Sequence, residues 1–250
     1  MAPEIPDFDF ETYVITLDPK SDRFLKFAGQ NPHLPYKVFE GIRGTSLSLA
    51  DCVYEKLMTP ECLAAGIATA GEIGCAASHK KLWELAANSK NGLLILEDDA
   101  ATHPLICEYI RINQEQILDA DIFLFSINTD SILEVEAPNG LRHVQVFDPK
   151  YPTYAWIETA LQRTKIEETQ IWRLIKGFGL CCYFLTPKGA KRILELVFPL
   201  TLERTPLPLL DLAVPGINVD KRLIAFYANI EAKISMPFLA WSPNSDSTTR

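Results

Sequence analysis

The sequence lacks any long apolar run. A membrane-spanning helix needs about 18 or more consecutive apolar residues, and no stretch of this chain approaches that length. Residues 1–11 are acidic and have neither the basic region nor the apolar core of a signal peptide. Together these two absences predict a cytoplasmic protein.

An excess of positive charge is also missing. The chain has 24 Lys and Arg residues against 32 Asp and Glu residues, a net charge of −8. Non-specific nucleic-acid binding needs clustered cations, so nucleic acid is not an expected partner. The 48% apolar and 22% charged residues are normal for a soluble globular protein, and 250 residues without a repeat or a linker predict one domain over residues 1–250.

Paired cysteines are absent as well. The six cysteines form no CxxC pair and show no zinc-type spacing. We therefore expect reduced, mostly buried thiols.

The most informative segment that is present is LLILEDD at residues 93–99. Its four aliphatic residues fit a strand buried on both faces, because such strands lose the apolar–polar alternation. Asn91 and Gly92 in front of it form a turn signal. The three acids therefore follow the end of a strand, where open α/β sheets bind their ligands.

Three adjacent carboxylates repel one another and need compensation. Hard oxygen ligands suit magnesium, calcium and manganese ions. If the extended geometry continues, Glu97 and Asp99 point to one side and Asp98 to the other, so the outer two acids can share one metal ion. The alternative is a solvated acidic turn after a buried strand.

Strands alternate with helices along the chain, which predicts an α/β fold with a central mixed, mostly parallel sheet and helices on both faces. The expected strands are 12–17, 36–40, 93–97, 121–126, 141–146 and 181–185. The expected helices are 21–27, 47–58, 72–88, 104–118 and 187–196, with a last one beginning at Asn218 or Asp220.

The remaining segments have weaker patterns. Four prolines predict a long loop over 199–215, and residues 153–176 carry no clear signature. The tail from Ser235 is rich in Ser, Thr, Asn and Pro and is expected to be flexible unless a ligand orders it. We expect loose termini at 1–10 and 240–250.

Four segments of the chain are informative about its family because of their order and spacing. They are YVITLD at 13–18 with Arg23, GEIGC at 71–75 followed by Ser78 and His79, LILEDD at 94–99, and residues 179–190. In this order they resemble the bacterial glycosyltransferase family 25, the lipooligosaccharide galactosyltransferase type. The resemblance spans residues 12–230, whereas 128–176 matches nothing in the family's pattern and is expected to help form the acceptor side.

The resemblance implies a GT-A type fold, a UDP-sugar donor (usually UDP-galactose), a divalent metal and inversion at the anomeric carbon. Glu97 and Asp99 resemble the family's DxD-type element, so they are expected to hold the metal, Mn²⁺ first and Mg²⁺ as the alternative. Asp98 is expected to contact the ribose or the sugar, or to coordinate through water. Asp220, which resembles the family's later acidic position, is the candidate base; Asp211 is a competitor.

Other residues are candidates for binding the donor. His79 could donate to a phosphate, complete the metal shell or be a packed helix histidine. Glu72 could hold sugar hydroxyls or be a first-turn acid favoured by the helix dipole. Arg23 could pair with the diphosphate or be a solvated surface arginine. By analogy with the fold, the strand end at Ile15, Leu17 and Asp18 is the expected uracil-binding edge.

The expected function is therefore an inverting, metal-dependent transfer of a hexose from a UDP-sugar to a hydroxyl of a lipooligosaccharide or another surface glycan. A lipid-linked acceptor would give peripheral contact with the inner face of the cytoplasmic membrane. Residues 245–247 could close over the donor, or form a solvated tail. The alternatives are a non-catalytic homologue that binds a sugar nucleotide or glycan, and a metal-dependent phosphohydrolase, although a DxDxT-like pattern is absent.

Overall fold

The computed structural model describes residues 8–147, 151–207 and 210–244. Nine of its strands form one sheet in the order β2-β1-β3-β9-β5-β12-β8-β6-β7. Their bounds are Glu11–Thr16 (β1), Lys37–Glu40 (β2), Leu93–Glu97 (β3), Ile122–Leu124 (β5), Ile132–Glu136 (β6), Arg142–Val146 (β7), Gln170–Lys176 (β8), Cys182–Leu185 (β9) and Ala232–Met236 (β12). Two separate pairs are β4 (Ala101–Thr102) with β13 (Ala240–Trp241), and β10 (Arg204–Leu207) with β11 (Leu212–Pro215).

The helices lie between these strands in the chain. Their bounds are Asp22–Gln30 (α1), Leu49–Tyr54 (α2), Pro60–Ala64 (α3), Ala70–Ala87 (α4), Ile106–Ile112 (α5), Gln114–Asp119 (α6), Tyr154–Arg163 (α7), Pro187–Val197 (α8) and Val219–Leu223 (α9). In the described ranges, no helix is long and apolar enough to cross a membrane.

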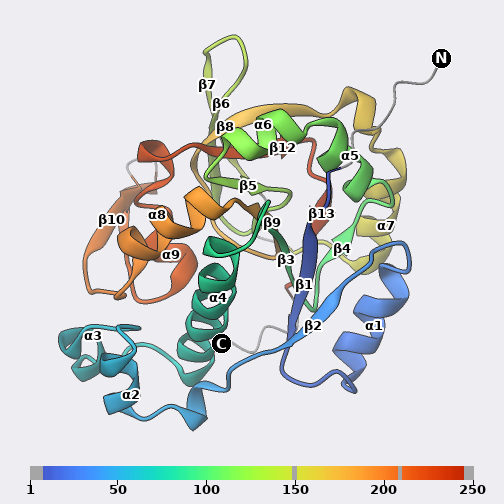
Figure 1. Ribbon diagram of the computed structural model, residues 1–250. Coiled ribbons are helices and arrows are strands. Elements are labelled where there is room, and N and C mark those ends of the chain that lie inside the picture. The colour runs from blue at the N-terminus through green and yellow to red at the C-terminus, as the bar shows by residue number, and fades with distance from the viewer. Residues whose placement is uncertain (1–7, 148–150, 208–209, 245–250) are drawn as a thin grey trace.

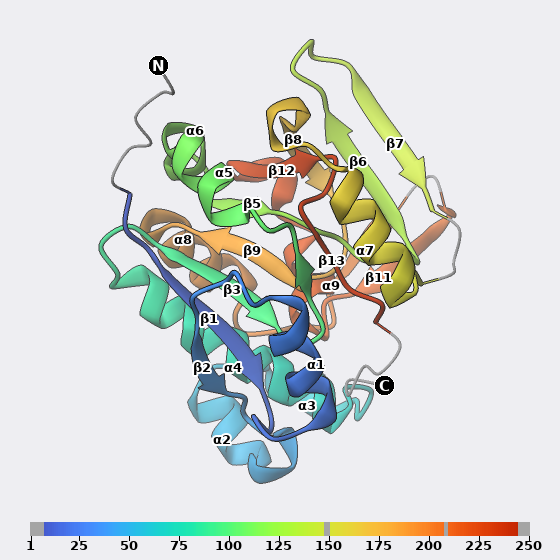
Figure 2. The ribbon, with the colours of Figure 1, turned by 90° about the vertical axis from the view of Figure 1, so that its right-hand side faces the viewer.

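The sheet confirms the predicted α/β class, but the expected parallel majority is wrong. The described strands of the large sheet make parallel pairs at β1–β2, β1–β3 and β5–β12 only. The other five pairs are antiparallel: β3–β9, β5–β9, β8–β12, β6–β7 and β6–β8. The reason is that β9 inserts antiparallel between β3 and β5, and a meander built on β6 and β8 extends one edge. Figure 2 shows the β6–β7 hairpin at the opposite end of the sheet from β2.

β3 is buried on both faces because the two faces carry different helices. Leu93 and Ile95 belong to a core cluster with residues of α4, α8 and α9. Leu94 and Leu96 belong to a second cluster with residues of α1, α5 and α6. Figure 1 shows α4, α8 and α9 on one side of the sheet and α1 and α5 on the other. The uninterrupted apolar run in the sequence thus corresponds to a central strand.

The start of α4 depends on small residues, as its sequence indicates. A Cβ atom on Gly74 would lie 2.4 Å from the Ile42 carbonyl oxygen, and one on Gly44 would lie 1.8 Å from the Ala70 carbonyl oxygen. Ser78 adds a hydrogen bond, since its Oγ accepts from the Ile42 amide at 2.8 Å. These contacts hold residues 42–44 against α4.

The expectation of loose termini is wrong for the parts that the structure describes. Phe8 is buried and Ala240 is completely buried. In the tail from Ser235 on, β12 continues to Met236 and β13 follows at Ala240–Trp241, and the amides of Leu239 and Ala240 both donate to the Phe125 carbonyl at 3.0 Å. The apolar residues 238–241 explain this docking. Burial of Phe238, Leu239 and Ala240 stabilises an ordered conformation, although the polar composition of the tail as a whole predicts flexibility. Residues 1–7 and 245–250, including the suggested lid at 245–247, lie outside the described residues.

Three other segments differ from their expected structure. The helix expected over 104–118 is two helices, α5 and α6, with Asn113 between them. The segment 153–176, which lacks a clear signature, forms α7 and β8. The expected loop at 199–215 contains the β10–β11 pair. Pro206 and Pro215 lie in these two strands, and edge strands tolerate proline.

Candidate functional site

A cavity of about 860 Å³ opens at the carboxyl ends of β1 and β3. All ten residues predicted for the site line it: Ile15, Leu17, Asp18, Arg23, Glu72, His79, Glu97, Asp98, Asp99 and Asp220. The competitor Asp211 does not; it is exposed and has a positive φ of 48°. The location therefore favours Asp220 over Asp211.

Strand register explains why the first and third strands contribute together. In the parallel pair β1–β3, Ile15 lies opposite Glu97. The chain leaves β1 through a tight turn in which the Ser21 hydroxyl donates to the Asp18 carbonyl at 2.8 Å. Ser21 then caps α1 by accepting from the Phe24 amide, which places Arg23 in the first turn of that helix.

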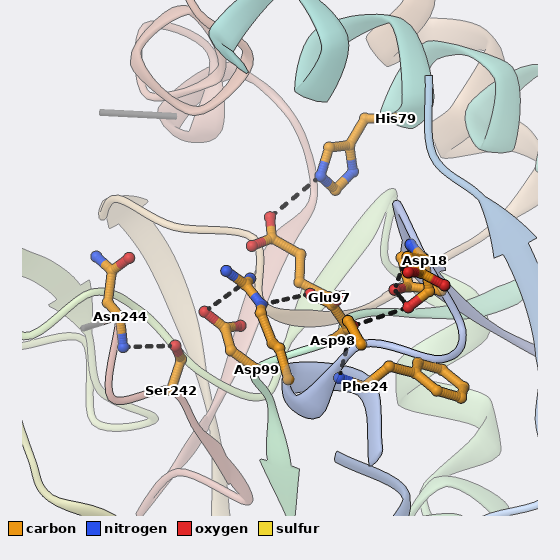
Figure 3. Close-up of polar contacts among 11 residues, drawn as sticks. Asp18, Phe24, His79, Glu97, Asp98, Asp99, Ser242 and Asn244 are labelled. Carbon is orange, nitrogen blue, oxygen red and sulfur yellow. Dashed lines mark hydrogen bonds and ion pairs between the residues drawn. The ribbon is translucent and has the colours of Figure 1, made fainter. Parts of the chain in front are cut away.

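Arg23 lies next to two of the three acids. Its Nε is 2.6 Å from Asp98 Oδ1, and its Nη2 is 3.2 Å from Asp99 Oδ2. The alternation expected for an extended chain does not continue, because β3 ends at Glu97 and residues 98–99 form a turn. Asp98 and Asp99 consequently reach the same guanidinium group, whereas Glu97 contacts His79 (Figure 3).

The acids differ in their protonation equilibria. Burial, followed by the nearby charge of Glu97, raises the pKa of Asp99 from 3.8 to about 6. Burial also raises the pKa of Glu97, but the hydrogen bond from His79, the charge that His79 carries when it is protonated and the charge of Arg23 together keep this pKa below its usual value. The cluster thus combines a carboxylate that is readily ionised with one whose charge is destabilised by its neighbours.

The cluster has properties that suit a hard cation. Asp99 Oδ1 is buried and, among the described residues, has no hydrogen-bond partner. A buried oxygen without a partner is costly and is a suitable ligand for a cation. In the part of the chain that the structure describes, the cavity lining carries seven carboxylates, at Asp18, Glu72, Glu97, Asp98, Asp99, Asp130 and Asp220, against three cations, at Arg23, Arg43 and Lys221. The residues present therefore fit a divalent metal ion.

His79 lies on the α4 side of the cluster and is almost fully buried. Its Nε2 is 3.3 Å from Glu97 Oε1, and its Nδ1 is 2.7 Å from the Tyr183 hydroxyl. Cys75, one helical turn earlier, completes a group whose three potential ligand atoms lie within 4.8 Å of one another. Sequence reasoning missed Cys75; its signal is the i, i+4 spacing to His79 on one helix face.

Glu72 has partners within the protein for both carboxylate oxygens. Oε2 accepts from the Thr69 amide at 2.9 Å, forming a capping box at the start of α4. Oε1 accepts from Asn218 Nδ2 at 3.0 Å and lies 3.4 Å from Lys221 Nζ. This geometry favours the first-turn alternative for Glu72, which links α4 to α9; a contact with the donor stays a prediction.

Asp220 lies in the first turn of α9, which Asn218 caps. Burial raises the pKa of Asp220, Lys221 opposes this shift, and the negative charge of Glu97 adds to it. Its Oδ1 accepts from the Lys221 amide at 2.8 Å. A carboxylate with a raised pKa is better suited to accepting a proton near neutral pH than an unperturbed one.

Sequence reasoning expected residues 128–176 to help form the acceptor side, but it named no residue of this further wall of the cavity. The wall includes Asn128, Asp130, Tyr151, Ser242 and Asn244. The Ser242 hydroxyl lies close enough to lower the pKa of Asp99, and Figure 3 shows Ser242 and Asn244 beside Asp99. The missed signal is the apolar segment that precedes Ser242, whose pairing with β4 directs the tail toward the acids.

The fold and the site define an α/β protein with an acidic binding cavity at the carboxyl ends of parallel strands. Residues 10–207 match glycosyltransferase family 25, described as an LPS biosynthesis protein family, so the chain belongs to this family. This confirms the resemblance carried by the sequence motifs.

A relative from Haemophilus influenzae, whose name proposes glycosyltransferase activity, is 32% identical over 128 residues. The match covers 51% of this chain and 36% of that protein, so the chain spans little more than a third of the relative's length.

Proposed function

We propose that this protein is an inverting, metal-dependent glycosyltransferase that moves a hexose, with galactose as the first candidate, from a UDP-sugar to a hydroxyl of a lipooligosaccharide or another surface glycan. One observation carries the proposal in a chain of this family. The three acids at the end of β3, the end of β1 and Asp220 on α9 all line one cavity. A donor, a cation and a base can therefore meet there.

Glu97 and Asp99 are the residues that would hold the metal ion, with Mn²⁺ preferred and Mg²⁺ as the alternative. A bound divalent ion neutralises negative charge that develops on the departing diphosphate. The end of β1 at Ile15, Leu17 and Asp18 offers an edge for the uracil base. Arg23 is suited to the diphosphate, because a guanidinium group matches phosphate oxygens.

Asp220 is the proposed base. Inversion requires the acceptor oxygen to attack the anomeric carbon from the face opposite the diphosphate, and the hydroxyl proton must leave during the attack. In the proposed step, the new bond joins the acceptor oxygen to the anomeric carbon, the bond to the diphosphate breaks, and Asp220 takes the proton. Asp98, next to Arg23, is proposed to contact the ribose or the sugar.

The acceptor is proposed to enter along Asn128, Asp130 and Tyr151, which line the cavity from the segment 128–176; the family match over residues 10–207 includes this segment. Tyr151 donates a hydrogen bond to Asp130 Oδ2, so an aromatic ring and a carboxylate lie together there. This combination suits sugar rings and hydroxyls. With a lipid-linked acceptor, the protein would work in the cytoplasm, at the inner face of the cytoplasmic membrane.

Thermal unfolding with UDP and MnCl₂ tests the donor and metal assignment. Ligands that bind the native state together raise the melting temperature more than either alone, so we expect a joint shift larger than the two separate shifts. Glu97→Ala should remove the joint component. Glu168→Ala, a change in an exposed acid paired with Lys165 far along the chain, is the matched control and should keep it. Absence of a shift with any nucleoside diphosphate would contradict the proposal.

A screen of UDP-sugars without acceptor separates the alternatives. A transferase releases UDP and free sugar slowly, in the presence of Mn²⁺ and not with a chelator. A non-catalytic homologue shows the thermal shift without any release, and a phosphohydrolase releases inorganic phosphate or a sugar phosphate instead. The sugar whose donor is hydrolysed fastest identifies the hexose.

A further inference from the structure

Four side chains form a continuous hydrogen-bonded series that ends on Glu97. Trp83 Nε1 lies 2.7 Å from the Tyr183 hydroxyl oxygen, and that oxygen lies 2.7 Å from His79 Nδ1. His79 Nε2 lies 3.3 Å from Glu97 Oε1. Trp83 and Tyr183 are completely buried and His79 is 1% exposed. The inner end of this series is therefore closed to bulk solvent.

The chemistry of each group sets the direction of the hydrogen bonds. An indole nitrogen can only donate, so the Tyr183 oxygen accepts from Trp83. The Tyr183 hydroxyl hydrogen must then find an acceptor, and among the described residues the only one within hydrogen-bond distance is His79 Nδ1. If His79 Nδ1 accepts, the ring proton is on Nε2, and Nε2–H donates to Glu97.

The other states of the ring leave a buried donor without a partner. With the proton on Nδ1, or on both nitrogens, His79 and Trp83 would both donate to the Tyr183 oxygen. The Tyr183 hydrogen would then have no acceptor within the described part of the chain, and such a buried orphan is destabilising. The arrangement therefore favours one neutral tautomer.

We propose that Trp83 and Tyr183 fix His79 as the Nε2–H tautomer, and that His79 thereby acts as a positioning residue for Glu97 and not as a metal ligand. The hydrogen bond holds Glu97 Oε1 and leaves Oε2 for the cavity. The group of Cys75, His79 and Glu97 is then no metal site, because a histidine nitrogen that carries a proton has no lone pair for a metal. The role toward the metal, though not the tautomer, rests on the proposed function.

The tautomer can be measured directly on the metal-free wild-type protein. The protein has four histidines, so ¹⁵N-histidine labelling and two-bond ¹H–¹⁵N correlation spectra at pH 7 give four ring patterns, of which the His79→Gln variant identifies the one that disappears. We expect a protonated Nε2 and an unprotonated Nδ1 for His79. A protonated Nδ1, alone or together with Nε2, would overturn the proposal. This measurement needs neither donor nor metal, so it stands even if the proposed function fails.

The Tyr183→Phe variant tests the inner half of the series. Removing the hydroxyl leaves His79 Nδ1 without its donor, so the two tautomers should mix and the Nδ1 and Nε2 shifts should move toward each other. An unchanged His79 pattern would show that Tyr183 does not fix the ring. Thr159→Val, which removes an exposed hydroxyl on α7, controls for a general effect of hydroxyl loss.

Mn²⁺ titration followed by electron paramagnetic resonance tests the outer half. A partner that orients a metal ligand typically changes metal affinity by about 10–100-fold, so His79→Ala should weaken Mn²⁺ binding by this factor. His79→Gln keeps an N–H at the Nε2 position and should restore affinity to within about threefold of the wild type. Gln as poor as Ala, in a variant that melts like the wild type, would overturn the positioning role. Tighter Zn²⁺ than Mn²⁺ binding that is lost in Cys75→Ser would overturn it as well.

Discussion

The acidic cluster has two sides that are held in different ways. On one side, the charged Arg23 contacts Asp98 and Asp99, and its side chain is 20% exposed. On the other side, the buried His79 contacts Glu97 through a hydrogen-bonded series that ends at Trp83. The first side opens to solvent mainly at Arg23, so a cation that enters the cavity can compete with Arg23 for the oxygens of Asp98 and Asp99. The second side can change only by breaking buried hydrogen bonds.

This difference suggests how the cluster accommodates a metal ion. Arg23 already balances the charge of Asp98 and Asp99 where a divalent cation would compete for the same oxygens. Glu97, in contrast, is held by the buried His79, so we expect its orientation to be the same with and without a cation. We therefore expect substitutions on the Arg23 side to alter competition for the cation, and substitutions on the Glu97 side to alter the preformed geometry.

Asp220 lies outside both sides, and its loss should have the largest effect. Asp220→Asn removes the proposed base, so turnover should fall by about 10²–10⁴-fold, the usual range for general-base loss. Binding of UDP with Mn²⁺ should persist, because Asp220 contacts neither Arg23 nor His79 in the structure. The measurement is steady-state turnover of a UDP-sugar beside the thermal shift. Turnover like that of the wild type would exclude Asp220 as the base.

Asp99→Asn should have the next largest effect. The amide keeps the shape but removes the charge, and it offers one neutral oxygen where the carboxylate has an unpartnered Oδ1. We expect Mn²⁺ affinity to drop by at least about tenfold, because loss of a group that merely orients a metal ligand already costs about this much. Isothermal titration measures it, with Asp119→Asn, an exposed acid on α6, as the control. Unchanged Mn²⁺ affinity would show that Asp99 is not a ligand of the metal ion.

Arg23→Gln tests whether the guanidinium and the metal compete. Without the competing charge, Mn²⁺ alone should bind several-fold more tightly, whereas the joint shift with UDP should shrink because a phosphate partner is lost. Arg43→Gln is the matched control: Arg43 lines the same cavity but donates to the Leu17 carbonyl at 3.0 Å. Weaker binding of Mn²⁺ alone in Arg23→Gln would break the comparison between the two sides.

A pH dependence should follow from Asp99, with the smallest effect. Its pKa is raised from 3.8 to about 6, so folding favours the protonated form. The metal-free protein should therefore lose stability as the pH rises from about 4 through about 6, whereas Mn²⁺ affinity should increase over the same window, because the metal needs the ionised form. Asp99→Asn should remove both trends. Chemical denaturation and Mn²⁺ titration between pH 4 and 7 measure them.

The local patterns in the sequence predicted those parts of the site that depend on short segments. The buried strand and its terminal acids, Glu72 as a first-turn acid of α4 and the helix that begins near Ser21 each follow from fewer than ten neighbouring residues. Parallel pairing then brings Ile15 opposite Glu97. Contacts over long sequence separation were not predictable in this way. Trp83 and Tyr183 are 100 residues apart, and Ser242 reaches Asp99 from a tail whose composition indicates flexibility.

The sequence by itself determined the family, the α/β class and the candidate site residues, because motifs and periodicity are local and survive without coordinates. Only the tertiary structure decided that antiparallel pairs outnumber parallel ones in the described sheet. It also decided that Asp98 and Asp99 both contact Arg23, and that Glu97 contacts His79. The physical reason is that charge pairing, hydrogen-bond direction and burial depend on which distant segments pack together. In this protein the turn at residues 98–99 and the docking of residues 238–242 determine which side chains meet in the acidic cluster.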